Sequence, residues 1–282
     1  MLVPVKTIQE ARKQLKSLWQ EEGSLGFVPT MGALHEGHLS LIRRSVNDNR
    51  FTVVSIFVNP TQFNEKHDFD HYPRNLETDL EIMSSYPIDL VFAPEAPEIY
   101  PEPDTRRFDF GGLDKTMEGL HRPGHFNGVA QVVSRLLDIV RPDRVYFGEK
   151  DFQQLAIVRA MVRQLEIPVE IIGCPIIREA DGLAMSSRNK LLTPEQRTVA
   201  TGISKALLRA RDLAGTLPVD KLQEMIIDQL SEYPILKVEY FQIVDRESLQ
   251  PVREWSDEGA KIGCIAVQIG KVRLIDNINI SS

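Results

Sequence analysis

The chain has 282 residues, of which 42% are hydrophobic and 26% charged, and its formal net charge is −7. The length suffices for one large domain or for a large and a small one. Nucleic-acid-binding proteins usually carry a basic patch, so the acidic balance and the lack of a large Lys/Arg cluster in the sequence predict no nucleic-acid partner.

The first residues, MLVPVKTIQE, lack the charged-then-apolar pattern of a signal peptide, and no apolar run approaches the roughly 18 residues of a membrane span. We therefore expect no membrane association and a cytoplasmic protein. Cys174 and Cys264 lie far apart in apolar surroundings, and the sequence has no CxxC motif. They are expected to be buried small hydrophobes rather than a zinc site or a redox pair.

Strand and helix patterns alternate through the first part of the chain. Such alternation predicts a Rossmann-like parallel sheet with helices on both faces. An outlying strand is expected at 106–110, after a loop rich in proline and acid at 93–104. The expected strands are 25–28, 52–58, 89–92, 145–147 and 169–172, and the expected helices are 6–20, 39–46, 76–86, 127–140 and 152–165.

The pattern changes after about residue 178. A long helix is expected at 194–214, with Thr193 as N-cap and Pro194 at its first position. A second helix at 219–233 precedes strand patterns near 236–244, 260–268 and 271–276. The sequence thus predicts an α/β domain over 1–178 and a smaller C-terminal α+β lid domain over 179–282.

The segment PTMGALHEGH, at 29–38, follows the first expected strand. In parallel sheets, ligands bind at the carboxyl ends of strands. If the next helix begins near Gly37, His35 and His38 point towards the ligand-binding edge of the sheet. There, imidazoles and helix N–H groups can bind phosphate. Gly32 and Gly37 let backbone approach a nucleotide closely. A metal pair and an inert turn remain alternatives, and the spacing differs from the HExxH zinc motif.

A second polar segment, MSSR, lies far downstream at 185–188. Its serine hydroxyls and arginine could hold phosphates from another side, although an ordinary polar linker is the alternative. The two segments together indicate nucleotidyl transfer, the chemistry that activates a carboxylate or a phosphate with ATP.

Five motifs in order carry a more specific resemblance: PTMGALHEGH, VSIFVNPTQF, YPR, FGEKDFQQL and MSSRN. The first resembles the HIGH-type signature of the nucleotidyltransferase superfamily. As a set, the motifs resemble those of the pantoate–β-alanine ligase family, and they cover most of 28–189. The resemblance implies ATP-dependent condensation of (R)-pantoate with β-alanine through a pantoyl adenylate, with release of AMP and pyrophosphate.

The resemblance also implies roles for individual residues. His38, Lys150 and Arg188 would be catalytic, acting on the phosphates, and the MSSR segment would close when ATP binds. Asp151 would contact the ribose or the adenylate, and it could instead, or in addition, cap the helix that follows it. The implied ATP-binding residues are Met31, Gly32, Ala33, Leu34, His35, Glu36, Gly37, His38, Gly148, Glu149, Lys150, Asp151, Ile177, Met185, Ser186, Ser187 and Arg188.

Gln62 and Gln154 match the glutamines that bind pantoate in the family, and an amide offers both donors and an acceptor to its hydroxyls and carboxylate. Asn59 is expected to shape the pocket near Ile177. Asp79 matches a position associated with magnesium, but we expect a surface helix carboxylate there. The polar loop at 121–128 is either a lid over the pantoate site or a simple helix cap.

The resemblance implies ATP with Mg²⁺ as the cofactor set, no metal bound by the protein alone, and a homodimer. A cytidylyl- or adenylyltransferase of the same superfamily is the alternative enzyme, although VNPTQF and FGEKDFQQ are not expected there. A fragment of a class I aminoacyl-tRNA synthetase fits less well. A non-catalytic nucleotide-sensing module is the alternative from another class, but it would not be expected to keep His35, His38, Lys150 and Arg188.

Overall fold

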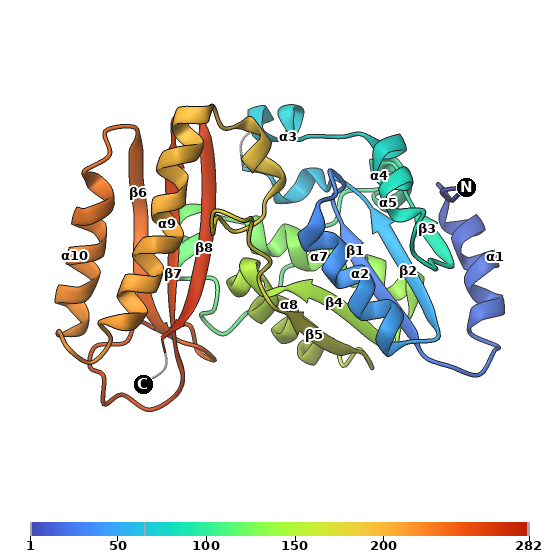
Figure 1. Cartoon of the computed structure of the whole chain (residues 1–282). Helices are drawn as coiled ribbons and strands as arrows, with labels where there is room; N and C mark the ends of the chain where they lie inside the picture. Colours follow the sequence, from blue (N-terminus) through green and yellow to red (C-terminus); the bar gives the residue numbers. More distant parts are fainter. Residues whose placement is uncertain (1, 65, 281–282) are drawn as a thin grey trace. The chain divides into compact units, whose positions relative to one another are not determined.

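A computed structural model describes residues 2–64 and 66–280 of the chain. Figure 1 shows helices and strands in the order that the sequence predicts for most of its length. The chain divides into two compact units: one comprises 1–110, 122–149 and 154–175, and the other 111–121, 150–153 and 176–282. The expected boundary at 178/179 stays a prediction. Among the described residues, no helix is long and apolar enough to cross a membrane.

The first unit is built on a five-stranded parallel sheet in the order β3-β2-β1-β4-β5. All five strands begin and end within a few residues of the expected positions, because continuous apolar runs are typical of strands in a parallel sheet. One of them, β3, is short, and its residues are all buried. The strands are β1 (Leu25–Thr30), β2 (Phe51–Ile56), β3 (Leu90–Phe92), β4 (Arg144–Gly148) and β5 (Glu170–Cys174).

Helices cover both faces of this sheet, as predicted. The helix α2 (Glu36–Asp48) packs on β1, β2 and β4, while α1 (Ile8–Leu18) and α7 (His125–Val140) pack together and α7 contacts β1. Because β2 and β4 lie on opposite sides of β1, right-handed crossovers place α2 and α7 on opposite faces. The strand order reverses between β1 and β4, which is the topological switch point where such sheets bind ligands.

The remaining elements of the first unit are shorter or lie outside the sheet. The expected helices at 76–86 and 152–165 are confirmed as α4 and α8, whereas η1, α3 and α5 were not predicted. The strand expected at 106–110 is wrong, since this segment pairs with no strand among the described residues. The bounds are η1 (Pro60–Gln62), α3 (Lys66–His71), α4 (Leu76–Met83), α5 (Ala96–Ile99) and α8 (Phe152–Gln164).

The second unit holds an antiparallel sheet in the order β6-β7-β8, covered by two helices. Thr193 caps the first helix as expected: its side chain accepts from the Gln196 N–H at 3.2 Å, and Pro194 stands at the first position. Short elements, which the sequence did not reveal, complete the unit. The bounds are α6 (Met117–His121), η2 (Glu149–Asp151, whose first residue belongs to the first unit), η3 (Ser187–Leu191), α9 (Pro194–Asp212), α10 (Val219–Ser231), β6 (Leu236–Asp245), β7 (Lys261–Ile269) and β8 (Val272–Ile280).

Both cysteines are free and buried, as predicted. Cys174 packs in the core cluster between α2 and the parallel sheet. Burial raises the pKa of the Cys174 thiol to about 11 and that of Cys264 to about 12. Thiols with such high pKa values stay protonated near neutral pH and act as packing groups.

Candidate functional site

The turn after β1 is held by a buried carboxylate. Gly32 and Ala33 both adopt positive φ, +80° and +50°. The Asp79 carboxylate accepts the N–H of Ala33 at 2.9 Å and that of Leu34 at 2.7 Å. A Cβ at position 32 would stand 2.9 Å from the same carboxylate, so glycine is needed for this close approach. The turn is therefore shaped by a residue 46 positions away in the chain.

The expectation that Asp79 is a surface carboxylate is wrong, because only 2% of the residue is exposed. A signal for burial was present in the sequence. Asp79 stands within the helical stripe of Leu76, Leu80 and Met83, at the i+3 position, which faces the core.

His35 and His38 cap the N-terminus of α2 reciprocally. The His35 Nδ1 accepts from the Gly37 N–H at 3.1 Å, and the His38 Nδ1 accepts from the His35 N–H at 3.3 Å. A nitrogen that accepts a hydrogen bond carries no proton, so this geometry assigns the proton of each neutral ring to Nε2. The ring centroids are 4.1 Å apart. Both rings thus combine a structural acceptor with a donor atom at Nε2.

The helix α2 begins at Glu36, close to the predicted start at Gly37. Its N-terminus therefore lies directly after the turn, where the helix dipole favours an anion. The Glu36 side chain forms an ion pair with Arg43 on the outer side of the helix. The other predicted residues of this segment, Met31 to Gly37, are brought together at the carboxyl end of β1.

Gln62 is buried at the end of η1, and its amide is oriented by neighbours. Its Oε1 accepts from the Asn59 amide at 3.1 Å, and its Nε2 contacts the sulfur of Met31 at 3.0 Å. The structure thus brings the predicted pantoate-binding glutamine next to the predicted ATP-binding turn. Asn59 belongs to this group through its contact with Gln62.

Two residues of the loop at 121–128 hold the backbone of Gln62. The His125 Nδ1 lies 2.7 Å from the Gln62 carbonyl oxygen, and an Arg122 nitrogen donates to the same oxygen at 3.3 Å. His125 is buried and begins α7. The loop is therefore a brace for Gln62 in this structure, and its opening and closing as a lid stay a prediction.

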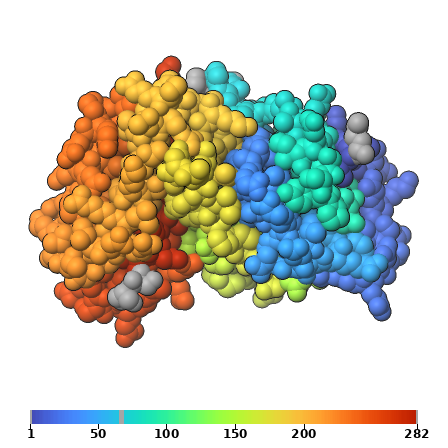
Figure 2. Space-filling view, viewed as in Figure 1, coloured from blue at the N-terminus to red at the C-terminus, as the bar shows by residue number. Residues whose placement is uncertain are grey.

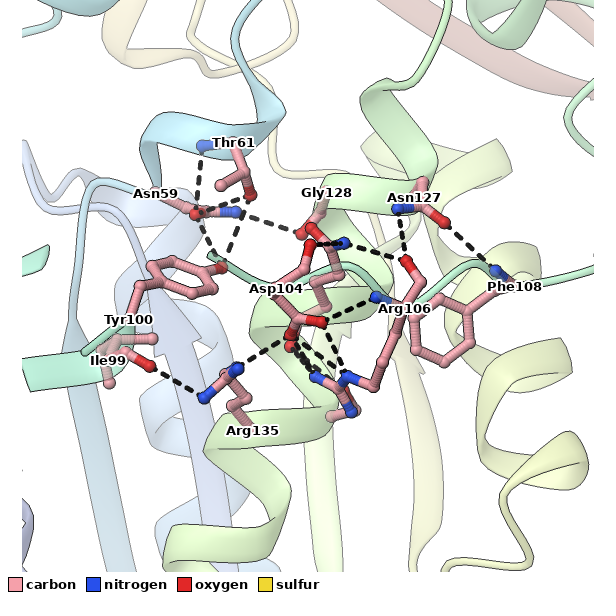
Figure 3. A network of polar contacts seen from close by, with 12 residues as sticks. Asn59, Thr61, Ile99, Tyr100, Asp104, Arg106, Phe108, Asn127, Gly128 and Arg135 are labelled. Atoms are coloured by element: carbon pink, nitrogen blue, oxygen red, sulfur yellow. Dashed lines mark hydrogen bonds and ion pairs between the residues drawn. The ribbon is translucent and has the colours of Figure 1, made fainter. Parts of the chain in front are cut away.

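A polar network that the sequence did not reveal lies beside Asn59 (Figure 3). The Tyr100 hydroxyl donates to the Asn59 Oδ1 at 3.0 Å. Arg135 lies over the Tyr100 ring, with its guanidinium carbon 5.2 Å from the centroid, and pairs with Asp104 at 2.9 Å. Arg106 pairs with the same carboxylate at 2.6 Å. The network links the acid-rich loop to α7 and, through Tyr100, to the residue that orients Gln62.

Asp104 supports a prediction about pH. Hydrogen bonds from Arg106 and Arg135 hold its pKa well below the usual value, and only 2% of its side chain is exposed. A depressed folded-state pKa stabilises the fold above the unfolded pKa of about 3.9, and this stabilisation is lost as the pH falls through the folded value. We expect Asp104→Asn to lower the free energy of unfolding at pH 7 by on the order of 2 kcal/mol.

The difference from wild type should shrink between about pH 4 and the acid limit of stability, as the carboxylate is protonated. Denaturant unfolding at about pH 7 and about pH 3 measures it. Glu102→Gln is the matched control, since Glu102 is an exposed acid in the same loop. A difference in unfolding free energy between wild type and Asp104→Asn that is independent of pH would contradict this account of Asp104.

Gly128 supports a second prediction. A Cβ at this position in α7 would stand 2.3 Å from the Thr61 carbonyl oxygen and 3.0 Å from the Gln62 Cα, so the η1 backbone must shift. We expect Gly128→Ala to lower kcat/KM for the substrate that Gln62 is predicted to bind by about 10-fold, because a small displacement misplaces Gln62. Gly202→Ala in α9 is the control: its nearest atoms are 3.7 Å away, and steady-state kinetics should be unchanged. Equal kinetics for both variants would contradict the prediction.

The turn after β4 holds the second predicted ATP segment. Gly148 and Glu149 belong to the first unit, whereas Lys150 and Asp151 group with the second. Asp151 is exposed and ends η2 directly before α8. Gln154 lies in the first turn of α8, half-buried, and its contact with pantoate stays a prediction.

The segment after β5 forms a hairpin that leads into MSSR. The Met185 N–H donates to the Ile177 carbonyl at 2.9 Å, so the predicted adenine-side residue and the start of MSSR are neighbours. The Ser186 hydroxyl accepts the Arg188 N–H at 3.3 Å and caps η3. This segment, drawn in yellow, reaches the surface on the face seen in Figure 2, and its tip at Ala180 and Asp181 is exposed. Ser187 is buried.

Glu179 and Asn189 fix the hairpin to η3 and α9. The Asn189 amide donates to the Glu179 carboxylate at 2.6 Å, and Arg197 of α9 pairs with the same carboxylate at 2.7 Å. The Arg197 hydrogen bond lowers the pKa of Glu179, so this acid stays ionised near neutral pH. The MSSR segment is thereby positioned by side chains rather than by a regular element.

These features define a class of protein with a doubly wound α/β fold. A capped histidine pair follows β1, and a second polar turn follows β4, the two strands that flank the switch point. The sequence profile of the family described as pantoate-β-alanine ligase matches residues 4–279. The chain therefore belongs to the pantoate-β-alanine ligase family.

Individual relatives agree with this assignment. A pantothenate synthetase of Bacteroides thetaiotaomicron is 52% identical over 274 residues, which cover 97% of each chain. The crystal structure of pantothenate synthetase from Thermus thermophilus is similar with a TM-score of 0.92 and 44% identity over 100% of both chains. A pantoate-β-alanine ligase of Francisella tularensis, solved with β-γ ATP and β-alanine, has a TM-score of 0.83 and 36% identity over 100% of this chain and 99% of that one.

Proposed function

We propose that the chain joins (R)-pantoate to β-alanine in an ATP-dependent reaction that yields pantothenate, AMP and pyrophosphate. The observation that carries this proposal is the Asp79-braced turn with its histidine pair, at the switch point of the sheet, in a chain that matches the family from residue 4 to 279. In the first step, a pantoate carboxylate oxygen attacks the α-phosphorus of ATP. The bond to the bridging oxygen breaks, pyrophosphate leaves, and pantoyl adenylate remains.

Charge on the phosphates would be stabilised by fixed donors. His38 would donate from Nε2, while Lys150 and Arg188 supply positive charge to the reacting phosphates. Ser186 and Ser187 would bind the leaving pyrophosphate, and the N-terminus of α2 would add the positive end of its dipole. The other residues of the ATP set would shape its binding: Met31, Gly32, Ala33, Leu34, His35, Glu36, Gly37, Gly148, Glu149, Asp151, Ile177 and Met185.

Gln62 and Gln154 would hold pantoate, and the contact between Asn59 and Gln62 supports a donating role for the Gln62 amide nitrogen. In the second step, the β-alanine amine attacks the acyl carbon of the adenylate. The carbon–oxygen bond to AMP breaks, and the amine loses a proton. Catalysis is then mainly positioning and electrostatic stabilisation, without a covalent enzyme intermediate.

Mg²⁺ would enter with ATP. Among the described residues, no cluster of three or more His, Cys, Asp or Glu could hold a metal. An Mg²⁺ ion that enters with ATP would keep mainly phosphate and water ligands. Bound there, the ion would neutralise part of the triphosphate charge, while the residues named above orient the reacting groups.

Assembly as a homodimer and localisation in the cytoplasm complete the proposal. Sedimentation equilibrium of the purified chain measures the first, since a dimer would have twice the chain mass of 32.0 kDa. Fractionation of cells with a specific antibody measures the second.

The test is exchange of labelled pyrophosphate into ATP without β-alanine. Pantoate-dependent exchange is expected, and adding β-alanine should then yield pantothenate. Exchange that requires a phosphate-bearing acceptor would instead indicate a cytidylyl- or adenylyltransferase. ATP binding without any exchange would indicate a nucleotide-sensing module.

A further inference from the structure

Two adjacent polar residues are buried in β8, a strand that otherwise supplies apolar side chains to the core of the second unit. Asp276 is 3% exposed and Asn277 is 5% exposed. They pair in register with Ile265 and Cys264 of β7. Buried polar groups are costly unless they are hydrogen-bonded, so their partners indicate what they do.

Asp276 anchors the hairpin that leads into MSSR. Arg178 binds the Asp276 carboxylate through both of its terminal nitrogens, at 2.7 and 3.0 Å. Arg178 also donates to the Gly182 carbonyl at 3.2 Å, across the hairpin. Because Arg178 directly follows Ile177, this bidentate pair fixes the predicted adenine-side residue relative to β8.

Asn277 anchors the other predicted phosphate-binding segment of the same unit. Its amide nitrogen donates to the Lys150 carbonyl oxygen at 2.9 Å. Gln153, three residues further on, donates to the carbonyls of Leu113 and Thr116 at 2.7 and 2.9 Å. The turn that carries Lys150 is thus fixed to the second unit by side-chain amides.

We propose that Asp276 and Asn277 are positioning residues that hold the Lys150 turn and the Ile177–Arg178 strand of the hairpin in one fixed arrangement, so that both segments act on the same ATP. Neither residue touches the reacting atoms. The inference rests on the proposed function, since it gives the two segments a common ligand. It also explains why a polar pair is retained in the core, where an apolar pair would pack without needing partners.

The test uses Asn277→Ala in the full chain, with Asn279→Ala as the matched control. Asn279 has the same residue type, lies two positions further along β8 and is exposed. We expect Asn277→Ala to lower the rate of pantoate-dependent pyrophosphate exchange at saturating ATP by about 10- to 100-fold, as for other small misplacements of catalytic groups. Asn279→Ala should exchange at the wild-type rate.

A double variant separates positioning from a merely structural role. If Asn277 acts through Lys150, Asn277→Ala should reduce exchange little further in a Lys150→Ala background. Losses that multiply in the double variant, or an Asn277→Ala variant that matches Asn279→Ala, would overturn the inference. Wild-type chain without pantoate-dependent exchange would instead contradict the proposed function, so the two failures are distinguishable.

A second substitution covers the case in which Asn277→Ala does not fold. Asn277→Leu keeps roughly the size of the side chain, but an apolar side chain cannot donate to the Lys150 carbonyl. The same loss of exchange is expected, with faster amide hydrogen exchange in a peptide covering 148–153 and unchanged exchange at 261–269. Full activity of this variant would overturn the inference as well.

Discussion

Replacing His38 with asparagine should abolish most adenylation while leaving the fold intact. The asparagine oxygen can take the place of Nδ1 and accept the His35 N–H, but asparagine has no donor at the position of Nε2. If the Nε2–H group stabilises charge on the phosphates, pyrophosphate exchange should fall by about 10²- to 10³-fold, the usual effect of removing one such donor. The thermal midpoint should change little, because the cap is kept.

Replacing His38 with glutamine should have the opposite pattern. The longer side chain can bring its amide N–H near the position of Nε2, while the contact made by Nδ1 is weakened. We expect this variant to exchange pyrophosphate faster than the asparagine variant and to unfold at a lower temperature. Asparagine retaining the wild-type rate would show that His38 only caps the helix, and equal rates for the two variants would rule out a specific donor.

That Nδ1 of each histidine accepts a backbone hydrogen bond while Nε2 remains a donor could not be predicted from the sequence. The motif indicated that His35 and His38 face a phosphate site, and the helix start was placed within a residue of Glu36. Which nitrogen accepts depends on the turn geometry at Gly32 and Ala33, and that geometry is imposed by Asp79 from another helix. The sequence around the turn does not indicate the hydrogen bonds from Ala33 and Leu34 to Asp79.

The sheet itself was predictable, because buried parallel strands give continuous apolar runs and their alternation with helices is regular. The segment at 106–110 shows where this signal fails. Alternating Phe108 and Phe110 resemble a strand, yet the Phe108 N–H donates to the Asn127 side chain, and the Asn127 and Gln131 amides donate to the Arg106 carbonyl. Side chains of α7 take the place of a neighbouring strand, so periodicity alone gave the wrong element.

The residues of the five motifs were predicted from the family resemblance, whereas the residues that hold them in position were not. Tyr100 and Asp104 lie in a loop that sequence describes only as rich in proline and acid, although Tyr100 contacts the residue that orients Gln62. Asn277 lies in a strand pattern and contacts a backbone carbonyl rather than a motif side chain. Supporting contacts of this kind depend on tertiary packing, so they become visible only in the structure.

Replacing Asp79 with alanine should have the largest effect on stability and should also reduce adenylation. The variant leaves the N–H groups of Ala33 and Leu34 without their acceptor, and unsatisfied buried donors cost about 1–3 kcal/mol each. We therefore expect a loss of about 2–6 kcal/mol in the free energy of unfolding. Exchange should fall by about 100-fold, because the turn that positions His35 and His38 is no longer held.

The same variant separates a brace from a magnesium ligand. A brace predicts that the unfolding free energy falls even without ATP and Mg²⁺, and that excess Mg²⁺ does not restore exchange. If Asp79 only binds Mg²⁺, the variant should unfold with the wild-type free energy and should need a higher Mg²⁺ concentration for pyrophosphate exchange. Glu77→Ala is the control, since Glu77 is an exposed acid in the first turn of the same helix and should change neither quantity. Because both Asp79 oxygens already accept backbone N–H groups, we expect the pattern of the brace.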